Sequence, residues 1–323
     1  MAFGVVLGAY VPGVSDSIDL IAYKGINIPI AIGLIVMMYP PLAKVDYRTL
    51  PVVLKDKKLL SLSLILNWIV GPLFMFFLAA YFLSDRPELM TGVVLIGLAR
   101  CIAMVLVWND LADGDSTYGA ALVALNSLFQ VFTFSFYAWF FLTILPTWMG
   151  MDRILIDVPF TMVAKNVGIY LGIPFLLGIG GRAVLIRLRG LLWYTDTYLP
   201  QIGPLTLISL LFTIVLMFSL QGARILGQTS DVLLVSIPLL LYFFGMWLLS
   251  YYAGRKLGAD EPRNRAVAFT AAGNNFELAI AVAIGVFGLH SSEAFVGVIG
   301  PLIEVPALLL LVQLSKRLTR YKA

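Results

Sequence analysis

Residues 97–110 read GLARCIAMVLVWND and place an arginine and the single cysteine of the chain inside an otherwise apolar run. The chain of 323 residues is 60% hydrophobic and 12% charged, and its mean hydropathy is +0.95. This composition is typical of a membrane protein with many spans. A cation and a lone thiol at bilayer depth need a protein or water lining, because hydrocarbon satisfies neither. We therefore expect Arg100 and Cys101 to mark the place where the protein handles something polar.

Ten apolar stretches approach the length of about 20 residues that a transmembrane helix needs. They cover residues 1–13, 26–43, 59–83, 89–112, 117–145, 160–181, 198–220, 231–254, 265–288 and 293–315. The first resembles the second half of a span, which predicts that helix 1 is truncated at its beginning. Residues 44–58 mix basic and apolar side chains and are expected to lie along the membrane surface. We predict an all-α integral membrane protein with ten transmembrane helices.

Basic residues gather in the connections that follow even-numbered spans. They are Lys44, Arg48, Lys55, Lys57, Lys58, Arg182, Arg187, Arg189, Arg255, Lys256, Arg263, Arg265, Lys316, Arg317, Arg320 and Lys322. The opposite side has fewer: Lys24, Arg86, Arg153 and Arg224, with Lys165 near a span end. Because basic loops stay in the cytoplasm, we expect a protein of the cytoplasmic membrane with both termini inside. The net charge of +4 is divided among these clusters and does not indicate a nucleic-acid partner.

Residues 1–150 and 151–323 repeat one pattern, in which the fourth span of each half has a polar interruption. The interruption is Arg100 and Cys101 in the first half and residues 273–277 in the second. The following span carries Asn126 in one half and Glu304 in the other. Five spans is an odd number, so the halves must be inverted repeats, a hallmark of secondary transporters with a site near the membrane midplane. We expect a core bundle of spans 3–5 and 8–10 and a second bundle of spans 1–2 and 6–7.

Cys101 permits two interpretations. A free cysteine is often a small buried hydrophobe. Here, however, the neighbouring guanidinium of Arg100 favours the nucleophilic thiolate, which is a soft ligand for thiophilic elements. A single thiol would capture such an element reversibly, as a transporter that must release its substrate requires.

Glu304 lies between two prolines in the last span, within residues 299–308, IGPLIEVPAL. An intramembrane carboxyl is costly when ionised and is therefore a candidate proton carrier. The alternative is a structural pair between Glu304 and Arg100.

Further polar residues are candidates for the wall of the same site. Asn274, Asn275 and Glu277 could bind a hydroxylated solute, bind a cation, or satisfy the interrupted backbone. Asn126 and Gln130 are four residues apart, so they face one side of their helix and are candidates for the same lining.

The composition also excludes several kinds of site. One cysteine rules out an intramolecular disulfide, and one histidine beside it argues against a structural zinc site. No span carries a nucleophile–base pair or a metal-ligand cluster. We therefore expect neither an enzyme nor a resident metal or cofactor.

Two motifs carry a resemblance to a known family. Residues 97–105, GLARCIAMV, with residues 107–115, VWNDLADGD, are similar to the hallmark of the Acr3 arsenite efflux permeases. Residues 275–283, NFELAIAVA, resemble their second signature. The resemblance covers nearly the whole chain and implies the bile/arsenite/riboflavin transporter superfamily. It matches the family's essential cysteine to Cys101 and its essential glutamate to Glu304.

This resemblance implies two inverted five-helix repeats whose helices 4 and 9 are broken and cross at the centre. It also implies export of arsenite, and in some members antimonite, driven by the proton gradient. Two alternatives stay open: a sodium-coupled organic-anion symporter of the same superfamily, and a passive arsenite channel driven by a separate ATPase. The oligomeric state stays open as well.

Overall fold

The computed structural model describes residues 26–151 and 159–320, apart from Tyr47 and Thr49, together with Val6, Ala22 and Tyr23. Almost all of this part is helical, which confirms the all-α prediction. Strands β1 (Ala22–Tyr23) and β2 (Ile26–Asn27) form one short antiparallel hairpin. The predicted first span, residues 1–13, lies outside the described residues apart from Val6, so the count of ten helices stays a prediction.

Each span predicted from residue 26 onward corresponds to helix. Within the described residues, six segments are long and apolar enough to cross a membrane, by length and composition. They are α5 (Lys57–Ile65) with η2 (Leu66–Val70) and α6 (Gly71–Leu83); α9 (Ser116–Trp139) with η3 (Phe140–Ile144) and α10 (Leu145–Trp148); α11 (Phe160–Val167) with η5 (Gly168–Gly172) and α12 (Ile173–Arg189); α13 (Leu191–Trp193) with η6 (Tyr194–Tyr198) and α14 (Leu199–Gly227); α15 (Thr229–Lys256); and α18 (Ser292–Arg320).

The remaining spans are shorter or broken. Helix α3 (Ile28–Lys44) follows the hairpin, and the short α4 (Leu50–Lys55) lies in the basic segment expected at the membrane surface. The fourth predicted span is split into α7 (Pro87–Leu98) and α8 (Met104–Leu111). The ninth is split into α16 (Glu261–Ala272) and α17 (Phe276–Phe287). Both interruptions therefore fall where polar residues interrupt the apolar pattern.

Four spans contain a π-helical turn, and each turn comes just before a proline. Pro72, Pro146, Pro174 and Pro200 are each the second residue after η2, η3, η5 and η6. In η2 the residue before the proline, Gly71, donates its N–H to the carbonyl five residues earlier, Leu66. A proline ring crowds the carbonyl four residues back, and widening the helix by one residue relieves that contact. Each of these four turns thus ends two residues before a proline, whose ring accounts for the wider helix.

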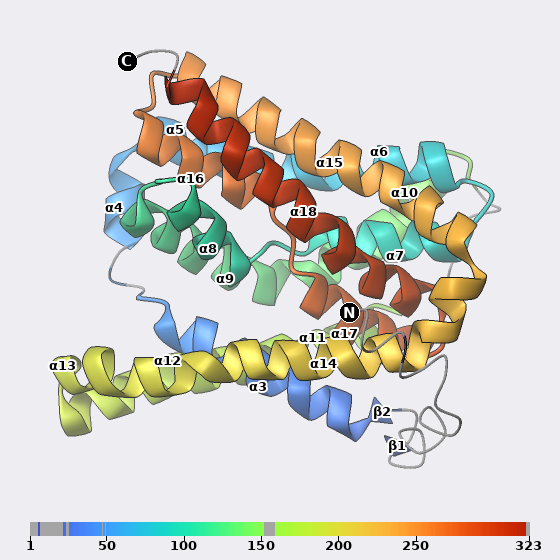
Figure 1. Ribbon diagram of the computed structural model, residues 1–323, viewed down its shortest axis with the longest axis horizontal. Helices are drawn as coiled ribbons and strands as arrows, with labels where there is room; N and C mark the ends of the chain where they lie inside the picture. The colour runs from blue at the N-terminus through green and yellow to red at the C-terminus, as the bar shows by residue number, and fades with distance from the viewer. Residues whose placement is uncertain are drawn as a thin grey trace.

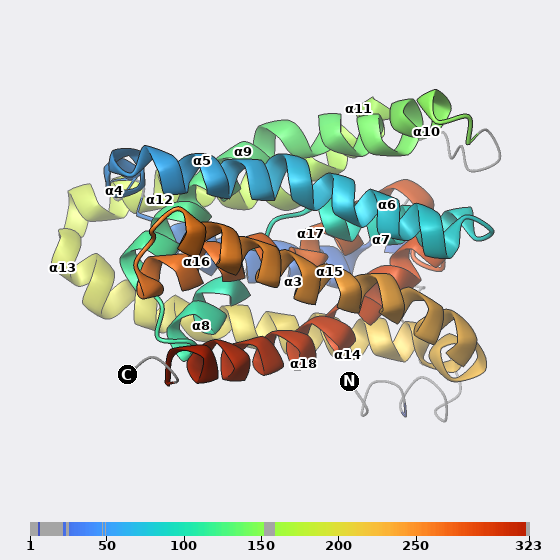
Figure 2. The same cartoon turned by 90° about the horizontal axis from the view of Figure 1, so that it is seen from above.

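The helices form two layers, visible in Figure 1. The lower layer consists of α3, α12 and α14, with α3 packed against both of the others. The upper layer consists of α5–α9 and α15–α18; within it α6 and α5 run in line beside α15 and α16 (Figure 2). Helix α11 contacts α9 and α17 of the upper layer and continues through η5 into α12 of the lower layer, so it links the layers. The inverted relation between residues 1–150 and 151–323 stays a prediction.

One end of the molecule gathers the segments that carry the basic clusters. In Figure 1, α4, α13, and the beginnings of α5 and α16 lie together at the left, with the end of α18. The sequence placed the basic connections on one side, and the arrangement of these elements agrees with that placement. We call this end the basic end. That it faces the cytoplasm stays a prediction from the charge rule.

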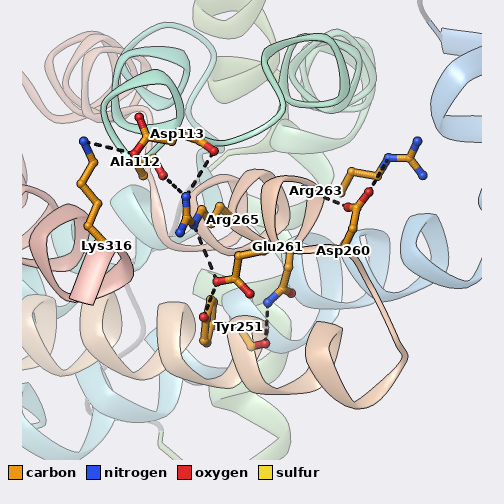
Figure 3. A network of polar contacts seen from close by, with 9 residues as sticks. Ala112, Asp113, Tyr251, Asp260, Glu261, Arg263, Arg265 and Lys316 are labelled. Atoms are coloured by element: carbon orange, nitrogen blue, oxygen red, sulfur yellow. Dashed lines mark hydrogen bonds and ion pairs between the residues drawn. The ribbon is translucent and has the colours of Figure 1, made fainter. Parts of the chain in front are cut away.

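A polar network fixes the core helices at the basic end (Figure 3). Arg265 donates to the carbonyls of Ala112 and Asp113, at 2.6 and 3.2 Å, and lies 3.7 Å from Glu261. Lys316 of α18 pairs with the Asp113 carboxylate at 3.3 Å. These contacts attach the turn after α8 to α16 and to α18, so they anchor one end of the first broken helix.

Candidate functional site

The two breaks pair with each other across the middle of the upper layer. Arg100 and Asn274 form an antiparallel bridge. Asn275 donates its backbone N–H to the Ala99 carbonyl at 2.9 Å, and Cys101 donates to the Gly273 carbonyl at 3.4 Å. A broken helix leaves backbone groups that hydrocarbon cannot satisfy, and this pairing satisfies several of them. The predicted crossing of two broken helices is therefore present.

Cys101 lies at the start of α8 and is buried, with 3% of its surface exposed. Its sulfur accepts the Val105 N–H at 3.2 Å and so caps the first turn of α8. The N-terminus of a helix carries partial positive charge, which is the end that favours an electron-rich sulfur. The local fold thus directs the thiol to the centre of the crossing.

Glu304 reaches the same crossing from α18. It is 2% exposed, and its Oε1 accepts the backbone N–H of Asn274 at 3.3 Å. A Cβ added to Gly273 would lie 3.2 Å from the Cys101 Cβ and 3.8 Å from the Glu304 Oε1. Cys101 and Glu304 therefore both lie beside Gly273, which has no side chain of its own. The structure brings together the two residues that the sequence singled out most strongly.

Arg100 is fully buried, and its guanidinium binds the ends of both helices that stop at the breaks. It donates to the Gly97 carbonyl at the end of α7 and to the Ala271 carbonyl at the end of α16, the latter at 3.5 Å. It also donates to the Tyr242 hydroxyl at 2.7 Å. Carbonyls at a helix C-terminus attract cations, so Arg100 stabilises two helix ends at once.

Arg100 and Cys101 are neighbours in an extended segment, in which consecutive side chains point to opposite faces. The contacts of Arg100 lie with α7, α15 and α16, whereas the sulfur of Cys101 contacts α8. The sequence predicts that the guanidinium of Arg100 favours the thiolate of Cys101; a direct contact between the guanidinium and the sulfur is not among the contacts of the described residues. Tyr242 is a partner that the sequence did not indicate, since it lies in an unbroken apolar span.

Two polar residues of α9 lie beneath the first break. Gln130 accepts the backbone N–H of Arg100, and Asn126 accepts the indole N–H of Trp68 at 3.1 Å. Both are buried. Their amide nitrogens have no hydrogen-bond partner among the described residues. Both residues thus belong to the walls of the site, Gln130 by direct contact with the break.

The second break contributes two asparagines and a glutamate. Asn275 caps α17 by accepting the Leu278 N–H at 3.0 Å. Asn274 is 1% exposed, and neither its amide oxygen nor its nitrogen has a partner in the described part of the chain. Glu277 lies one turn further along α17 and lines a small cavity between α17, α18 and the lower layer. Glu277 thus lies beside the crossing, on the side of this small cavity.

A larger cavity lies on the other side of the crossing. It has a volume of about 490 Å³ and lies between the lower layer and α8. It extends from Ile102 and Ala103, next to Cys101 in the chain, to the ends of α3 and α8 at Lys44 and Asp110. Lys44 and Asp110 are exposed, so the cavity is open at the basic end. The larger cavity therefore reaches the residues next to Cys101, whereas the cavity on the side of Glu277 is narrow.

Comparison with known proteins yields four similarities. Residues 31–228 match the Sodium Bile acid symporter family. The arsenical-resistance protein Acr3 of Corynebacterium glutamicum is 50% identical over 312 residues, which is 97% of this chain and 84% of that protein. The Acr3 arsenical-resistance protein of Alkaliphilus metalliredigens is 31% identical over 326 residues, 97% of this chain and 88% of that protein. An uncharacterized transporter of Synechocystis is 31% identical over 336 residues, 98% of this chain and 85% of that protein.

Proposed function

The chain belongs to the Sodium Bile acid symporter family and, within it, to the Acr3 arsenical-resistance proteins, and from this premise we propose that it exports arsenite in exchange for protons. Members of this family are transporters, so the chain is a multi-pass membrane transporter and not an enzyme. We place it in the cytoplasmic membrane with the basic end inside. Arsenite export from the cytoplasm would confer arsenic resistance.

One observation carries the proposal: Cys101 and Glu304 face the same point above Gly273. A soft sulfur ligand and a titratable oxygen are the two groups that exchange of a thiophilic solute for protons requires. The cavity that leads to this point from the basic end supports entry of the solute from the cytoplasm.

Arsenite reaches the site as the neutral trihydroxide. The Cys101 thiol displaces one hydroxyl from arsenic, so an S–As bond forms while an As–O bond breaks. The thiol proton and the hydroxyl leave together as water, and arsenic stays As(III). Release on the far side is the reverse reaction with water. A single thiol makes one such bond, which keeps the capture reversible.

The surrounding residues have supporting roles in this proposal. Arg100 positions Cys101 by binding the ends of α7 and α16. The partnerless amide of Asn274 is available to the arsenic hydroxyls. Asn126 accepts the indole N–H of Trp68 and Asn275 caps α17, so both stabilise the walls of the site. Glu277 lines the narrow side of the passage.

Glu304 couples transport to the proton gradient. The solute is neutral, so the membrane potential alone does not drive it uphill. A carboxyl that takes a proton outside and releases it inside supplies a coupled charge, worth about 2.3 kcal/mol per 100 mV. Its hydrogen bond to the Asn274 backbone places this carboxyl at the second break.

The test uses inside-out vesicles, in which uptake of arsenite reports export. We expect the wild type to accumulate arsenite when the lumen is acid, and Cys101→Ser to fall to background. Serine retains a hydroxyl that can accept the Val105 N–H, so it is the matched control for the fold, which a melting curve checks. Wild-type uptake by Cys101→Ser would remove the thiol from the mechanism.

The same assay tests coupling and substrate range. For Glu304→Gln we expect uptake that no longer responds to the pH gradient; a retained response would remove this carboxyl from coupling. Competition by antimonite tests whether it shares the site, because antimony(III) is also thiophilic. Uptake that requires sodium instead of a pH gradient would favour a sodium-coupled symporter. Uptake that needs neither would favour a passive channel.

A further inference from the structure

The larger cavity has one positive and one negative side chain among its lining residues, and they come from opposite walls. Lys44 is the last residue of α3, in the lower layer. Asp110 lies near the end of α8, in the upper layer. Both are exposed at the open end of the cavity. The two charges therefore flank the route from the basic end to the crossing.

Three acidic groups at this end have cationic partners. Asp46 pairs with Arg182 at 2.7 Å, Asp113 with Lys316 at 3.3 Å, and Asp115 with Arg263 at 3.7 Å. Among the described residues, Lys44 and Asp110 have no ion pair. Asp110 accepts only the Ser116 hydroxyl, at 2.6 Å. Lys44 and Asp110 are thus two opposite charges, without an ionic partner in the described part of the chain, that line opposite walls of the same cavity.

We propose that Lys44 and Asp110 are a gate pair: they meet and form an ion pair when the cavity closes, and so stabilise the state in which the crossing is shut off from the basic end. This inference rests on the proposed transport function, since a solute moved uphill must not find both ends open at once. Closure brings the lower layer against α8, and the ends of α3 and α8 are the parts that meet at the mouth.

The electrostatics suit a gate that must reopen. Closure without a partner would remove a single charge from water, which is costly. Pairing Lys44 with Asp110 cancels that cost. An ion pair near the surface contributes little stability, so it biases the closed state without locking it. A neutral solute passes between these charges in the open state without binding strongly to either.

The test measures the closed state directly and does not depend on transport. Thr206 of α14 lines the cavity, so Thr206→Cys in a Cys101→Ser background places one thiol inside it. A membrane-impermeant maleimide added to inside-out vesicles reacts with this thiol only while the cavity is open. We expect Lys44→Ala and Asp110→Ala to raise the labelling rate about two- to fivefold, the range of an exposed ion pair.

Exchanging the charges of Lys44 and Asp110 tests whether the two residues act as a pair or independently of each other. Lys44→Asp alone places two acids at the mouth and should raise the rate most, while Lys44→Asp with Asp110→Lys should restore the original rate. Ser116→Ala is the matched control for Asp110, because it removes the hydrogen bond and keeps the carboxylate; we expect no change. A reporter at Lys256→Cys, exposed at the same end but outside the cavity lining, should label equally in all variants.

The outcomes are distinguishable. Unchanged labelling in the single variants, or an exchanged pair that labels like the single variants, would overturn the gate pair. In a further outcome, the labelling rates rise in the single variants and return in the exchanged pair while wild-type vesicles fail to take up arsenite. That result would support the gate pair and show that the proposed substrate is wrong.

Discussion

The two breaks begin in the same backbone conformation but differ in length and in the side chains that they carry. Residues 99–103 separate α7 from α8 and carry a cation and a thiol, whereas residues 273–275 separate α16 from α17 and carry a glycine and two asparagines. Both begin in extended conformation, with φ and ψ of −85° and 118° at Ala99 and −74° and 142° at Gly273. The first break supplies the reactive group, and the second supplies space and backbone donors for it.

The helices that follow the breaks also differ in how they are capped. Asn275 caps α17 with an amide oxygen, a strong acceptor. Cys101 caps α8 with a sulfur, which is a weak acceptor. Breaking a weak contact costs little, so the sulfur can leave the cap to bind arsenic without unravelling α8. We therefore expect the Asn275 cap of the second break to stay in place during transport. The sulfur contact of the first break can be exchanged for another.

Removing Arg100 is expected to have the largest effect, because this side chain joins both breaks. Arg100→Ala leaves the Gly97 and Ala271 carbonyls and the Tyr242 hydroxyl without their donor inside the protein. Hydrogen bonds to a buried charge are worth about 1.5–3 kcal/mol each, so we expect a loss of about 3–5 kcal/mol. A melting curve in detergent measures it. Arg100→Lys keeps the charge without the planar fork, so its stability should lie between that of the wild type and that of Arg100→Ala. Wild-type stability in Arg100→Ala would show that the breaks stay together without this side chain.

A side chain at Gly273 tests whether the second break supplies space. In Gly273→Ala the new Cβ would lie 3.2 Å from the Cys101 Cβ and 3.3 Å from the Phe269 carbonyl, so the crossing must shift slightly. We expect arsenite uptake to fall about tenfold, equivalent to about 1.4 kcal/mol on the barrier, with little change in melting temperature.

Gly168→Ala is the matched control, because an added Cβ there meets nothing within 4 Å. We expect uptake by this variant to equal that of the wild type. Equal losses in both variants, or full activity in Gly273→Ala, would contradict the role given to the second break.

The positions of the breaks were predictable, and their side-chain contacts were not. Polar residues inside apolar spans indicated both interruptions, since hydrocarbon tolerates such residues only in a lined cavity. The direction of Arg100 depends on the register in which the two breaks pair, and a single sequence does not encode that register locally. Tyr242 lies in an unbroken span, so no pattern indicated that it would bind a cation.

Other features of the structure also differ in how far the sequence predicts them. Each π-helical turn lies at a fixed distance before a proline, but prolines inside α3, α14, α15 and α18 have no such turn, so prolines alone did not predict where the turns lie. The state of the cavity could not be predicted, because opening at the basic end depends on how α3 and α14 pack against α8. The sequence grouped Glu277 with Asn274, and the structure adds that Glu277 lines a small cavity beside α18 and the lower layer. That cavity could not be predicted, because it depends on how α17 and α18 pack against α3 and α14.

The smallest expected effect compares the two caps. Asn275→Ala removes the oxygen that accepts the Leu278 N–H and should destabilise the protein by about 1 kcal/mol. Cys101→Ala removes only a sulfur acceptor from Val105 and should cost a few tenths of that, because thiols accept weakly. Asn275→Ser keeps a good cap and should recover most of the loss. Melting curves of the three variants decide the matter: equal losses for Asn275→Ala and Cys101→Ala would mean that the sulfur is a structural cap and not a contact the protein can exchange.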